Sequence, residues 1–333
     1  MPAAALAFSG PSPAARIVTK AAPTAATGRL RIGIVCNPKS HRNRGAEYAA
    51  GVPGATRVMI AAPRTREALA DTLAEFAAAR VDLLVIDGGD GTVRDVLTGA
   101  GAIWGGDWPA IAVIPSGKTN ALALDLGIPA GWSINDALEA ATAGRTVRRR
   151  PLEIARGDGG RPLRGFLFGA GAFVGGTDLA QHTHRAGAFN GVAVGLAVAW
   201  AIGQTLFGSD AGRWRAGERM RLRLPGCEAE ERRRYMLLAT TLQRLPLGIK
   251  VFGEVAGGMR VFDVDGPPRR VLTTLPAILT GRASGWLETH GYRRREAASF
   301  DLCMDAGFVL DGERFPGGSL TVRQGPLLSF VAP

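Results

Sequence analysis

Short apolar runs alternate with helical patterns over the first 144 residues of the chain. Four of these runs have the length and composition of buried strands: residues 30–36, 56–61, 83–86 and 110–114. Between them, residues 64–79 place Leu69, Leu73 and Phe76 on one face of a helix, and helical patterns also begin at Thr92 and Ala121. Strands and helices that alternate at this spacing predict a parallel sheet wrapped by helices.

The pattern changes beyond about residue 144, where short apolar runs replace the helical segments. The runs are typical of antiparallel strands: residues 151–155, 165–168, 220–224, 235–241, 259–264, 270–274, 300–304, 308–310 and 320–322. Residues 1–28 are rich in Ala, Pro, Ser and Thr, which predicts a flexible tail. We therefore predict a two-domain fold, with an α/β domain over residues 29–146 and an antiparallel β-sandwich over residues 147–333.

One segment interrupts the antiparallel pattern. Residues 186–208 carry no charge over 23 positions and are mostly apolar, and this length reaches the transmembrane range. Polar or turn-forming residues break the run, among them Asn190, Gly191, Gly195 and Gln204. We predict a helix that lines an apolar pocket or rests on a bilayer surface, in preference to a membrane span.

The strongest candidate for chemistry is the turn Gly88-Gly89-Asp90-Gly91-Thr92, which follows the predicted strand at 83–86. Neighbouring glycines permit close backbone approaches, and the N–H groups of such a turn can hold phosphate oxygens. A carboxylate would repel phosphate, so Asp90 suits the binding of a magnesium ion on a polyphosphate or the acceptance of a proton. An ordinary tight turn is the alternative.

Two further turns fall at the same edge of the predicted sheet. One follows Cys36, and the other reads Pro115-Ser116-Gly117-Lys118-Thr119-Asn120 after the strand at 110–114. Ligands of such sheets bind beyond the carboxyl ends of the strands, where all three turns lie. Their convergence indicates a nucleotide site.

Composition and charge indicate the class of partner. The chain has 333 residues, is 46% hydrophobic and 21% charged, and carries a net charge of +11, supplied mainly by arginine. Arginine richness reflects either a GC-rich genome or attraction to phosphate-bearing partners. The basic clusters belong to no recognisable nucleic-acid-binding motif, so we expect solvated loops or an anionic membrane surface, and no nucleic acid. These clusters are residues 148–150, 232–234, 269–270 and 293–295.

Cysteine and histidine usage suggests no metal or disulfide framework. Cys36, Cys227 and Cys303 are far apart and odd in number, which fits reduced thiols in the cytoplasm. The N-terminal residues lack the basic start and apolar core of a secretion signal. His182 and His184 would share a face of a strand and suit a metal, but the segment is typical of a helix or loop, so we expect surface histidines.

Four motifs resemble the diacylglycerol kinase catalytic-domain family, which includes bacterial lipid kinases and the sphingosine and ceramide kinases and has the NAD kinases as distant relatives. The motifs follow the family's order and spacing over roughly residues 30–333: Asn37-Pro38-Lys39-Ser40, the glycine turn at 88–92, the turn at 115–120, and Asp311-Gly312-Glu313. The resemblance implies an ATP-binding α/β domain, a β-sandwich that carries the lipid site, and ATP with Mg²⁺ in the cleft between them.

The resemblance also implies a role for each matched residue. The residues that would surround the ATP phosphates are Gly88, Gly89, Asp90, Gly91, Thr92, Val93 and Arg94, with Asp90 engaging magnesium or the nucleotide. Asn37 and Ser40 would border the nucleotide, and Gly117, Lys118, Thr119 and Asn120 would form the second phosphate-side turn. Glu313 would accept the proton of the attacking hydroxyl, because phosphoryl transfer needs a base near the nucleophile.

Four positions depart from the family's pattern. Lys118 stands where the family has a threonine that contacts ATP, and Arg94-Asp95 replaces an Asn-Glu pair. His41 replaces a glycine, and residues 255–259 lack the aspartate of a metal site in the second domain, while Asp263 and Asp265 nearby are not assigned a metal. Such a chain is a divergent member that is either active or a catalytically impaired lipid-binding protein.

We therefore predict an ATP- and magnesium-dependent lipid kinase that phosphorylates a hydroxyl of a membrane lipid of diacylglycerol, sphingoid-base or ceramide type. Residues 186–208, flanked by Arg185 and Arg213, would help it to reach the bilayer, so we expect a cytoplasmic protein peripherally associated with the inner face of the membrane. A homodimer is left open. An NAD kinase is disfavoured, because Asn120 precedes Ala-Leu-Ala where NAD kinases have Asn-Glu.

Overall fold

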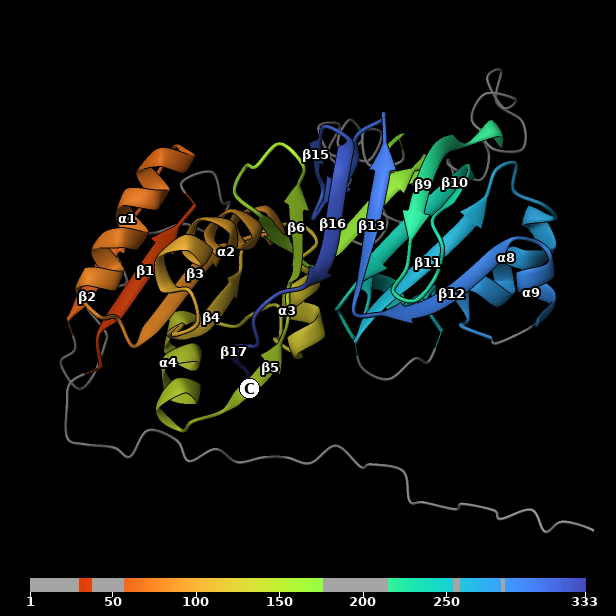
Figure 1. The fold of residues 1–333 in the computed structure, drawn as a ribbon. Coiled ribbons are helices and arrows are strands. Elements are labelled where there is room, and N and C mark those ends of the chain that lie inside the picture. The colour runs from red at the N-terminus through yellow and green to blue at the C-terminus, as the bar shows by residue number, and fades with distance from the viewer. Residues whose placement is uncertain (1–29, 38–56, 176–214, 254–257, 283–284) are drawn as a thin grey trace, which may run out of the picture.

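The computed structural model describes residues 30–37, 57–175, 215–253, 258–282 and 285–333. Over these residues the chain forms an α/β domain and an antiparallel β domain that lie side by side (Figure 1). The predicted fold class is thereby confirmed. The segment 186–208, the histidines His182 and His184, and Ser40 lie outside the described residues.

Six strands form the sheet of the α/β domain, in the order β2-β1-β3-β4-β17-β5. Their bounds are β1 (Ile32–Cys36), β2 (Val58–Ala61), β3 (Leu83–Gly88), β4 (Ala110–Pro115), β5 (Thr146–Arg149) and β17 (Leu328–Val331). The pairs among β1 to β4 and between β4 and β17 are parallel, and β5 runs antiparallel to β17. Every residue of β1 and β3 is buried, which explains why these strands read as continuous apolar runs.

Helices pack on this sheet where the periodicity predicts them. The helix α1 (Arg66–Ala78) begins after Thr65, whose hydroxyl accepts a hydrogen bond from the Ala68 amide at 3.2 Å. Its buried face presents Phe76 to Gly33 of β1, where an added Cβ would lie 2.4 Å from the ring. The other helices that the structure describes in this domain are α2 (Asp90–Trp104), α3 (Ala121–Leu126) and α4 (Ile134–Thr142).

Eleven strands form the sheet of the second domain, and each of its pairs is antiparallel. The main order is β15-β14-β8-β10-β9-β13-β16-β6-β7, and β11 joins β10 to β12. The bounds are β6 (Leu152–Arg156), β7 (Leu163–Gly165), β8 (Leu167–Gly171), β9 (Glu218–Arg223), β10 (Glu230–Thr240), β11 (Met259–Asp265), β12 (Tyr292–Ala297), β13 (Ser299–Met304), β14 (Phe308–Leu310), β15 (Glu313–Phe315) and β16 (Gly318–Gln324).

This sheet folds over on itself, so that its two ends share one core. The long strand β10 pairs with β9 through its first half and with β8 through its second half. On its other edge, its register with β11 shifts between Arg234 and Met236. Phe168 of β8 stacks on Phe308 of β14 at 5.3 Å and also meets Phe300 of β13 edge-on at 6.1 Å. The layers of the predicted sandwich are therefore parts of one curled sheet.

The structure corrects the predicted domain boundary. Residues 147–149 and 328–331, both assigned to the second domain, lie in β5 and β17 of the first sheet. The chain thus crosses back after β16, and its last strand lies between β4 and β5. Periodicity cannot show this return, because β17 is a short apolar run like the antiparallel strands that precede it.

The strand predicted at residues 270–274 is wrong. The segment begins α8 (Val271–Leu279), which buries Thr274 and Ile278, one helical turn apart, and α9 (Gly285–Thr289) follows it. Both helices lie at the end of the β domain farthest from the first sheet (Figure 1). The apolar run continues past residue 274 for longer than a typical strand, and this length is the signal that distinguishes the helix.

Candidate active site

The three predicted turns converge at the carboxyl edge of the first sheet. Asn37 follows β1, and its side-chain amide donates a hydrogen bond to the Thr92 hydroxyl at 3.0 Å. The backbone N–H of Asn37 also bonds to the Asp87 carbonyl at 2.9 Å, so the end of β1 is fixed against the end of β3. The sequence prediction that these turns meet is therefore confirmed by their contacts.

Gly89 and Gly117 bring the second and third turns into direct backbone contact. An added Cβ on Gly89 would lie 2.9 Å from the Gly117 Cα, and one on Gly117 would lie 2.4 Å from the Gly89 Cα. Asn120, in the left-handed region at φ 51°, holds the third turn closed: its side chain accepts from the Gly117 N–H at 3.0 Å and donates to the Gly117 carbonyl at 2.9 Å. Only glycines permit this approach.

Asp90 joins the first turns of two helices. It is the first residue of α2, and its carboxylate accepts hydrogen bonds from the N–H groups of Ala121 at 3.0 Å and Leu122 at 3.3 Å, at the start of α3. Burial raises the pKa of Asp90, and these backbone hydrogen bonds oppose the rise. The backbone of Asn120 and of Asp90 itself also donates to this carboxylate, which therefore ties the starts of the two helices together.

The second domain delivers an acidic hairpin to this site. The strands β14 and β15 are joined by Asp311 and Gly312, both at positive φ, 46° and 81°, as a tight hairpin turn requires. The Asp311 carboxylate accepts from the Phe166 N–H at 3.0 Å and the Leu167 N–H at 2.9 Å. Burial, together with the charge of Asp90, raises the pKa of Asp311 to about 7. The hairpin turn therefore lies within electrostatic reach of Asp90.

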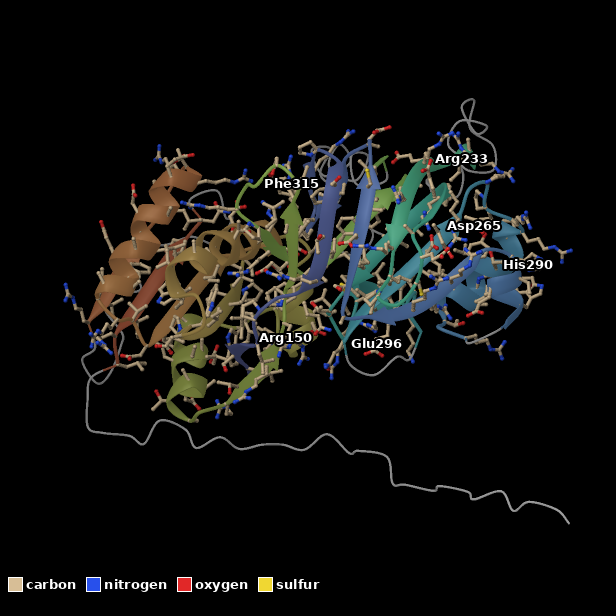
Figure 2. All side chains as sticks on the ribbon, viewed as in Figure 1. Arg150, Arg233, Asp265, His290, Glu296 and Phe315 are labelled. Atoms are coloured by element: carbon tan, nitrogen blue, oxygen red, sulfur yellow. The ribbon has the colours of Figure 1, made fainter. Side chains whose placement is uncertain are left out.

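Glu313, the first residue of β15, contacts the helix that Asp90 begins. Its carboxylate forms an ion pair with Arg94 of α2 and a second with Arg66 of α1, the latter at 2.6 Å. Arg94 is 3% exposed and also bonds to Asp95 at 2.9 Å. The Arg94 guanidinium lies over the ring of Phe315, 5.6 Å from its centroid. Figure 2 shows Phe315 on the side of the second domain that faces the first. Residues more than 200 positions apart thus form one ionic cluster.

The remaining predicted site residues differ in how exposed their side chains are at the carboxyl edge of the first sheet. Lys118 and Thr119 are exposed on the third turn, whereas Val93 is buried in the core of the first domain, so only its backbone can meet a ligand. Gly88 packs against Thr92, where a Cβ would lie 2.5 Å from its side chain. Gly91 lies in the first turn of α2.

Sequence reasoning missed several residues that shape the site. Arg66 lies on an amphipathic helix whose exposed face gave no signal of a partner. Asp87, which is 2% exposed, accepts a hydrogen bond from the Ser116 hydroxyl, and a carboxylate at the end of an apolar strand could have indicated it. Burial and the charge of Asp87 raise the pKa of Cys36 to about 11, so this thiol is protonated at neutral pH.

The donor set fits a metal held mainly by a nucleotide. Among the described residues, no group of three or more His, Cys, Asp or Glu side chains is placed to bind a metal ion. Magnesium at phosphate sites takes one or two carboxylates and completes its shell with phosphate oxygens and water. Asp90, with Asp311 nearby, meets that requirement, and the turn of Gly89 and Gly117 offers backbone without side-chain obstruction.

The fold is that of a two-domain protein. The first domain is an α/β domain of the nucleotide-binding type, and an acidic hairpin of the curled antiparallel sheet contacts it at the carboxyl edge of its own sheet. Residues 31–154 match the family model described as the diacylglycerol kinase catalytic domain. A diacylglycerol kinase of Bacillus subtilis (strain 168) is 36% identical over 85 residues, which cover 26% of this chain and 26% of that protein. The match thus spans about a quarter of the length of this relative.

Solved structures share the fold over nearly the whole chain. A diacylglycerol kinase from Bacillus anthracis str. Sterne has a TM-score of 0.60 at 15% identity, covering 91% of this chain and 97% of that chain. A putative diacylglycerol kinase from the same organism has a TM-score of 0.61 at 16% identity, with the same coverage. At these identities the likeness establishes the fold of both domains together.

Proposed function

We propose that the protein is an ATP-dependent lipid kinase, which transfers the γ-phosphoryl group of ATP to a hydroxyl of a membrane lipid of diacylglycerol, sphingoid-base or ceramide type. The observation that carries the proposal is the ion pair between Glu313 and Arg94, because it brings a carboxylate from the second domain to the glycine-turn helix. The family of residues 31–154 supports a kinase, and the lipid acceptor extends that assignment.

The glycine turns supply the nucleotide side of the proposed reaction. Gly89 is the N-cap of α2, and the N-terminus of a helix favours phosphate oxygens. Lys118, exposed on the neighbouring turn, adds a positive charge in place of a hydroxyl contact. Magnesium, when bound with ATP, neutralises the charge that develops on the transferred phosphoryl group.

Glu313 supplies the acceptor side. Two ion pairs, with Arg66 and Arg94, orient the carboxylate and occupy two of its roughly four lone-pair positions. The remaining positions can receive the proton of an attacking hydroxyl, which in phosphoryl transfer accelerates the reaction on the order of a hundredfold or more. Arg66 has a side chain that is 60% exposed, so the carboxylate is reached from solvent on that side.

The test is phosphoryl transfer from γ-labelled ATP by the purified full-length chain. The acceptor panel holds dispersed diacylglycerol, a sphingoid base, ceramide and NAD, each with and without Mg²⁺. We expect label in one of the lipids, dependent on Mg²⁺, and none in NAD. Label in NAD alone would assign the chain to the other branch, and label in no acceptor would contradict the kinase proposal.

A lipid-binding protein without catalysis is the second candidate. It is favoured by the double ion pairing of Glu313, since both of its oxygens are engaged by guanidinium groups. Binding of a fluorescent lipid together with ATP turnover distinguishes the two proteins. Lipid binding without any turnover supports the second candidate, whereas turnover that is lost in Asp90→Asn with lipid binding retained supports the kinase.

A further inference from the structure

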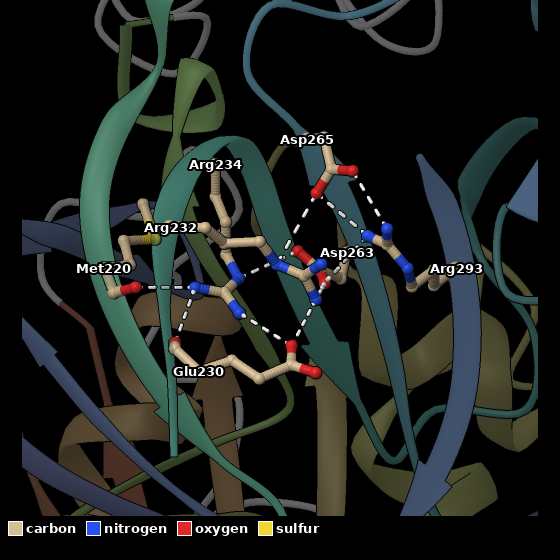
Figure 3. Close-up of polar contacts among 7 residues, drawn as sticks. All are labelled: Met220, Glu230, Arg232, Arg234, Asp263, Asp265 and Arg293. Atoms are coloured by element: carbon tan, nitrogen blue, oxygen red, sulfur yellow. Dashed lines mark hydrogen bonds and ion pairs between the residues drawn. The ribbon is translucent and has the colours of Figure 1, made fainter. Parts of the chain in front are cut away.

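The structure sorts the basic clusters of the sequence into internal and external ones. Three arginines from two of the clusters lie in an ionic network across β10, β11 and β12 (Figure 3). Arg234 is fully buried and bonds to Asp263 at 3.0 Å, while Arg293 bonds to Asp265 at 2.8 Å and Arg232 lies 3.2 Å from Asp263. Glu230 also pairs with Arg232 and Arg234, so three carboxylates balance the three guanidinium groups. These arginines therefore stabilise the sheet and leave no surplus for a partner.

The cluster at 148–150 is also engaged internally. Arg149 forms an ion pair with the buried Asp125 at 2.6 Å, and Arg150 donates to the Gly325 carbonyl at 2.9 Å. Arg294, from the fourth cluster, donates to the Val251 carbonyl at 2.7 Å. Each of these contacts fixes one strand or loop to another.

The cluster at 269–270 is different. Arg269 and Arg270 are exposed, as is Arg282, and none of the three guanidinium groups makes an ion pair or hydrogen bond with a described residue. They flank α8 at its two ends, and Glu288 of α9 is the single acidic residue between positions 266 and 289. Three arginines therefore outnumber one glutamate at this end of the β domain.

The helix between these arginines is apolar on its outer side as well as its inner side. The segment Val271–Leu279 has no charged residue, and Leu272 is 65% exposed although Thr274 and Ile278 are buried. Six large hydrophobic side chains are strongly exposed among the described residues, and three of them lie here: Leu247, Leu272 and Trp286. Leu247 belongs to the turn beside the end of α8, where the Lys250 N–H bonds to the Leu279 carbonyl at 2.9 Å.

The two helices that carry most of these residues lie at one tip of the molecule. Both α8 and α9 stand at the far end of the β domain, and His290, which follows α9, marks the extremity (Figures 1 and 2). Ile278 of α8 and Leu287 of α9 share a core, so the two helices form one rigid support. We define the α8–α9 surface as Leu247, Leu272 and Trp286 together with Arg269, Arg270 and Arg282.

We propose that the α8–α9 surface is the site at which this protein rests on an anionic lipid bilayer. Exposed aliphatic and indole side chains suit shallow insertion at the headgroup boundary, and flanking arginines suit anionic headgroups. No helix in the described part of the chain is long and apolar enough to cross a membrane. A second copy of the chain is disfavoured as the occupant, because a two-fold contact would bring the unpaired arginines of both copies together.

The proposal deepens the proposed function by naming its membrane contact, and its test measures binding without turnover. The full chain is sedimented with phosphatidylcholine vesicles, with and without phosphatidylglycerol. Two variants are tested. The apolar double variant combines Leu272→Ser with Trp286→Ser, and the arginine triple variant combines Arg269→Gln, Arg270→Gln and Arg282→Gln. Matched controls are Ile60→Ser, also an exposed hydrophobic at 40%, and Arg57→Gln with Arg80→Gln and Arg161→Gln, which remove the same charge elsewhere.

We expect the wild type to bind the vesicles that contain phosphatidylglycerol, and to bind the neutral phosphatidylcholine vesicles only weakly. The apolar double variant should bind at least about tenfold more weakly than the wild type. The arginine triple variant should bind about a hundredfold more weakly, since each arginine near a membrane contributes roughly a fivefold factor. The controls should bind like the wild type. Far-UV circular dichroism confirms that each variant is folded.

Equal loss in the control triple would overturn the proposal, because binding would then depend on net charge alone. Unchanged binding of both surface variants would also overturn it, and so would a change in their oligomeric state with vesicle binding unchanged, which assigns the surface to a second copy. Vesicle binding that survives when no lipid is phosphorylated rejects the kinase and retains this surface. The two failures are therefore distinguishable.

Discussion

Gly89 and Gly117 show how the absence of a side chain at two facing positions shapes the candidate site. Their Cα atoms face each other across two turns, with no room for a Cβ on either side. Backbone approaches of this kind place two sets of N–H groups at one sheet edge, which is the arrangement that phosphate requires. The glycines of these motifs are thus fixed by geometry, before any contact with a ligand.

Replacing Gly117 with alanine tests that geometry. We expect Gly117→Ala to lower the free energy of unfolding by about 1–3 kcal/mol, because the new Cβ overlaps the Gly89 backbone, which cannot swing aside like a side chain. Urea unfolding measures the change. The control is Gly106→Ala, where nothing lies within 4 Å of the added atom, and it should change stability by less than about 0.5 kcal/mol. Equal effects would contradict the close approach.

Asp311 gives a pH dependence of known sign. Its pKa is raised from 3.8 to about 7, so the folded state holds a proton that the unfolded state has lost between these values. The contribution of this group to stability is therefore greatest at acid pH and falls as pH rises through 4 to 7. Asp311→Asn keeps an oxygen for the Phe166 and Leu167 N–H groups and removes the titration.

The variant should therefore gain stability relative to the wild type as pH rises. Between pH 5 and pH 8 we expect the difference in unfolding free energy to move in its favour by about 2–3 kcal/mol. Chemical denaturation at the two pH values measures it. A difference that does not change with pH would show that Asp311 titrates normally and lies in water.

Among the elements, α2 and the hairpin of β14 and β15 matter most, because their contact joins the two domains at the site. Arg94 contributes the buried end of that contact, and it pairs with Glu313 and Asp95 while donating to the Leu310 carbonyl at 3.3 Å. A guanidinium buried to this extent depends on its partners, since an unpaired buried charge is costly.

A double-mutant cycle on Arg94→Met and Glu313→Gln measures this link. We expect a coupling energy of about 1–3 kcal/mol in unfolding, because the pair is partly buried and directly bonded. The matched pair is Arg145 and Glu139, 3.7 Å apart with side chains 43% and 79% exposed, which should couple by less than about 0.5 kcal/mol. Equal coupling in the two cycles would mean that the hairpin does not hold Arg94.

The sequence predicts these elements unevenly, for physical reasons. The strands β1, β3 and β4 are predicted well because both of their faces are buried, which leaves unbroken apolar runs. The helix α8 was missed because residues 270–274, taken without the residues that follow them, do not distinguish a strand from a helix. The meeting of Glu313 with Arg94 is implied by the family resemblance, whereas the ion pairs themselves depend on strand register across the curled sheet.

At the scale of the whole molecule, the last strand returns the chain to the sheet of the first domain. β17 lies between β4 and β5, with Leu328 and Phe330 fully buried, so the two ends of the described chain share one sheet. Phe330 also meets Phe166, which precedes β8, at 6.1 Å and thereby packs the first core against the second domain. The chain returned to the first domain where the sequence had predicted only the second.

Truncating one side chain of this strand should weaken the whole protein. We expect Phe330→Ala to lower the free energy of unfolding by about 3–5 kcal/mol, because it leaves a cavity in the first core. Leu327→Ala, three residues earlier and 46% exposed, should cost less than about 0.5 kcal/mol. Both are read from the urea midpoint, and a small effect of Phe330→Ala would show that β17 is not an inner strand.

The proposed reaction depends on the carboxylate that the second domain brings to the first. The most direct test is the initial rate of labelled phosphoryl transfer from ATP to lipid by the wild type, by Glu313→Gln and by Glu139→Gln, a matched change at an exposed glutamate. We predict that Glu313→Gln reduces kcat at least about a hundredfold while Glu139→Gln leaves it unchanged. A folded Glu313→Gln protein with the wild-type kcat would contradict the account.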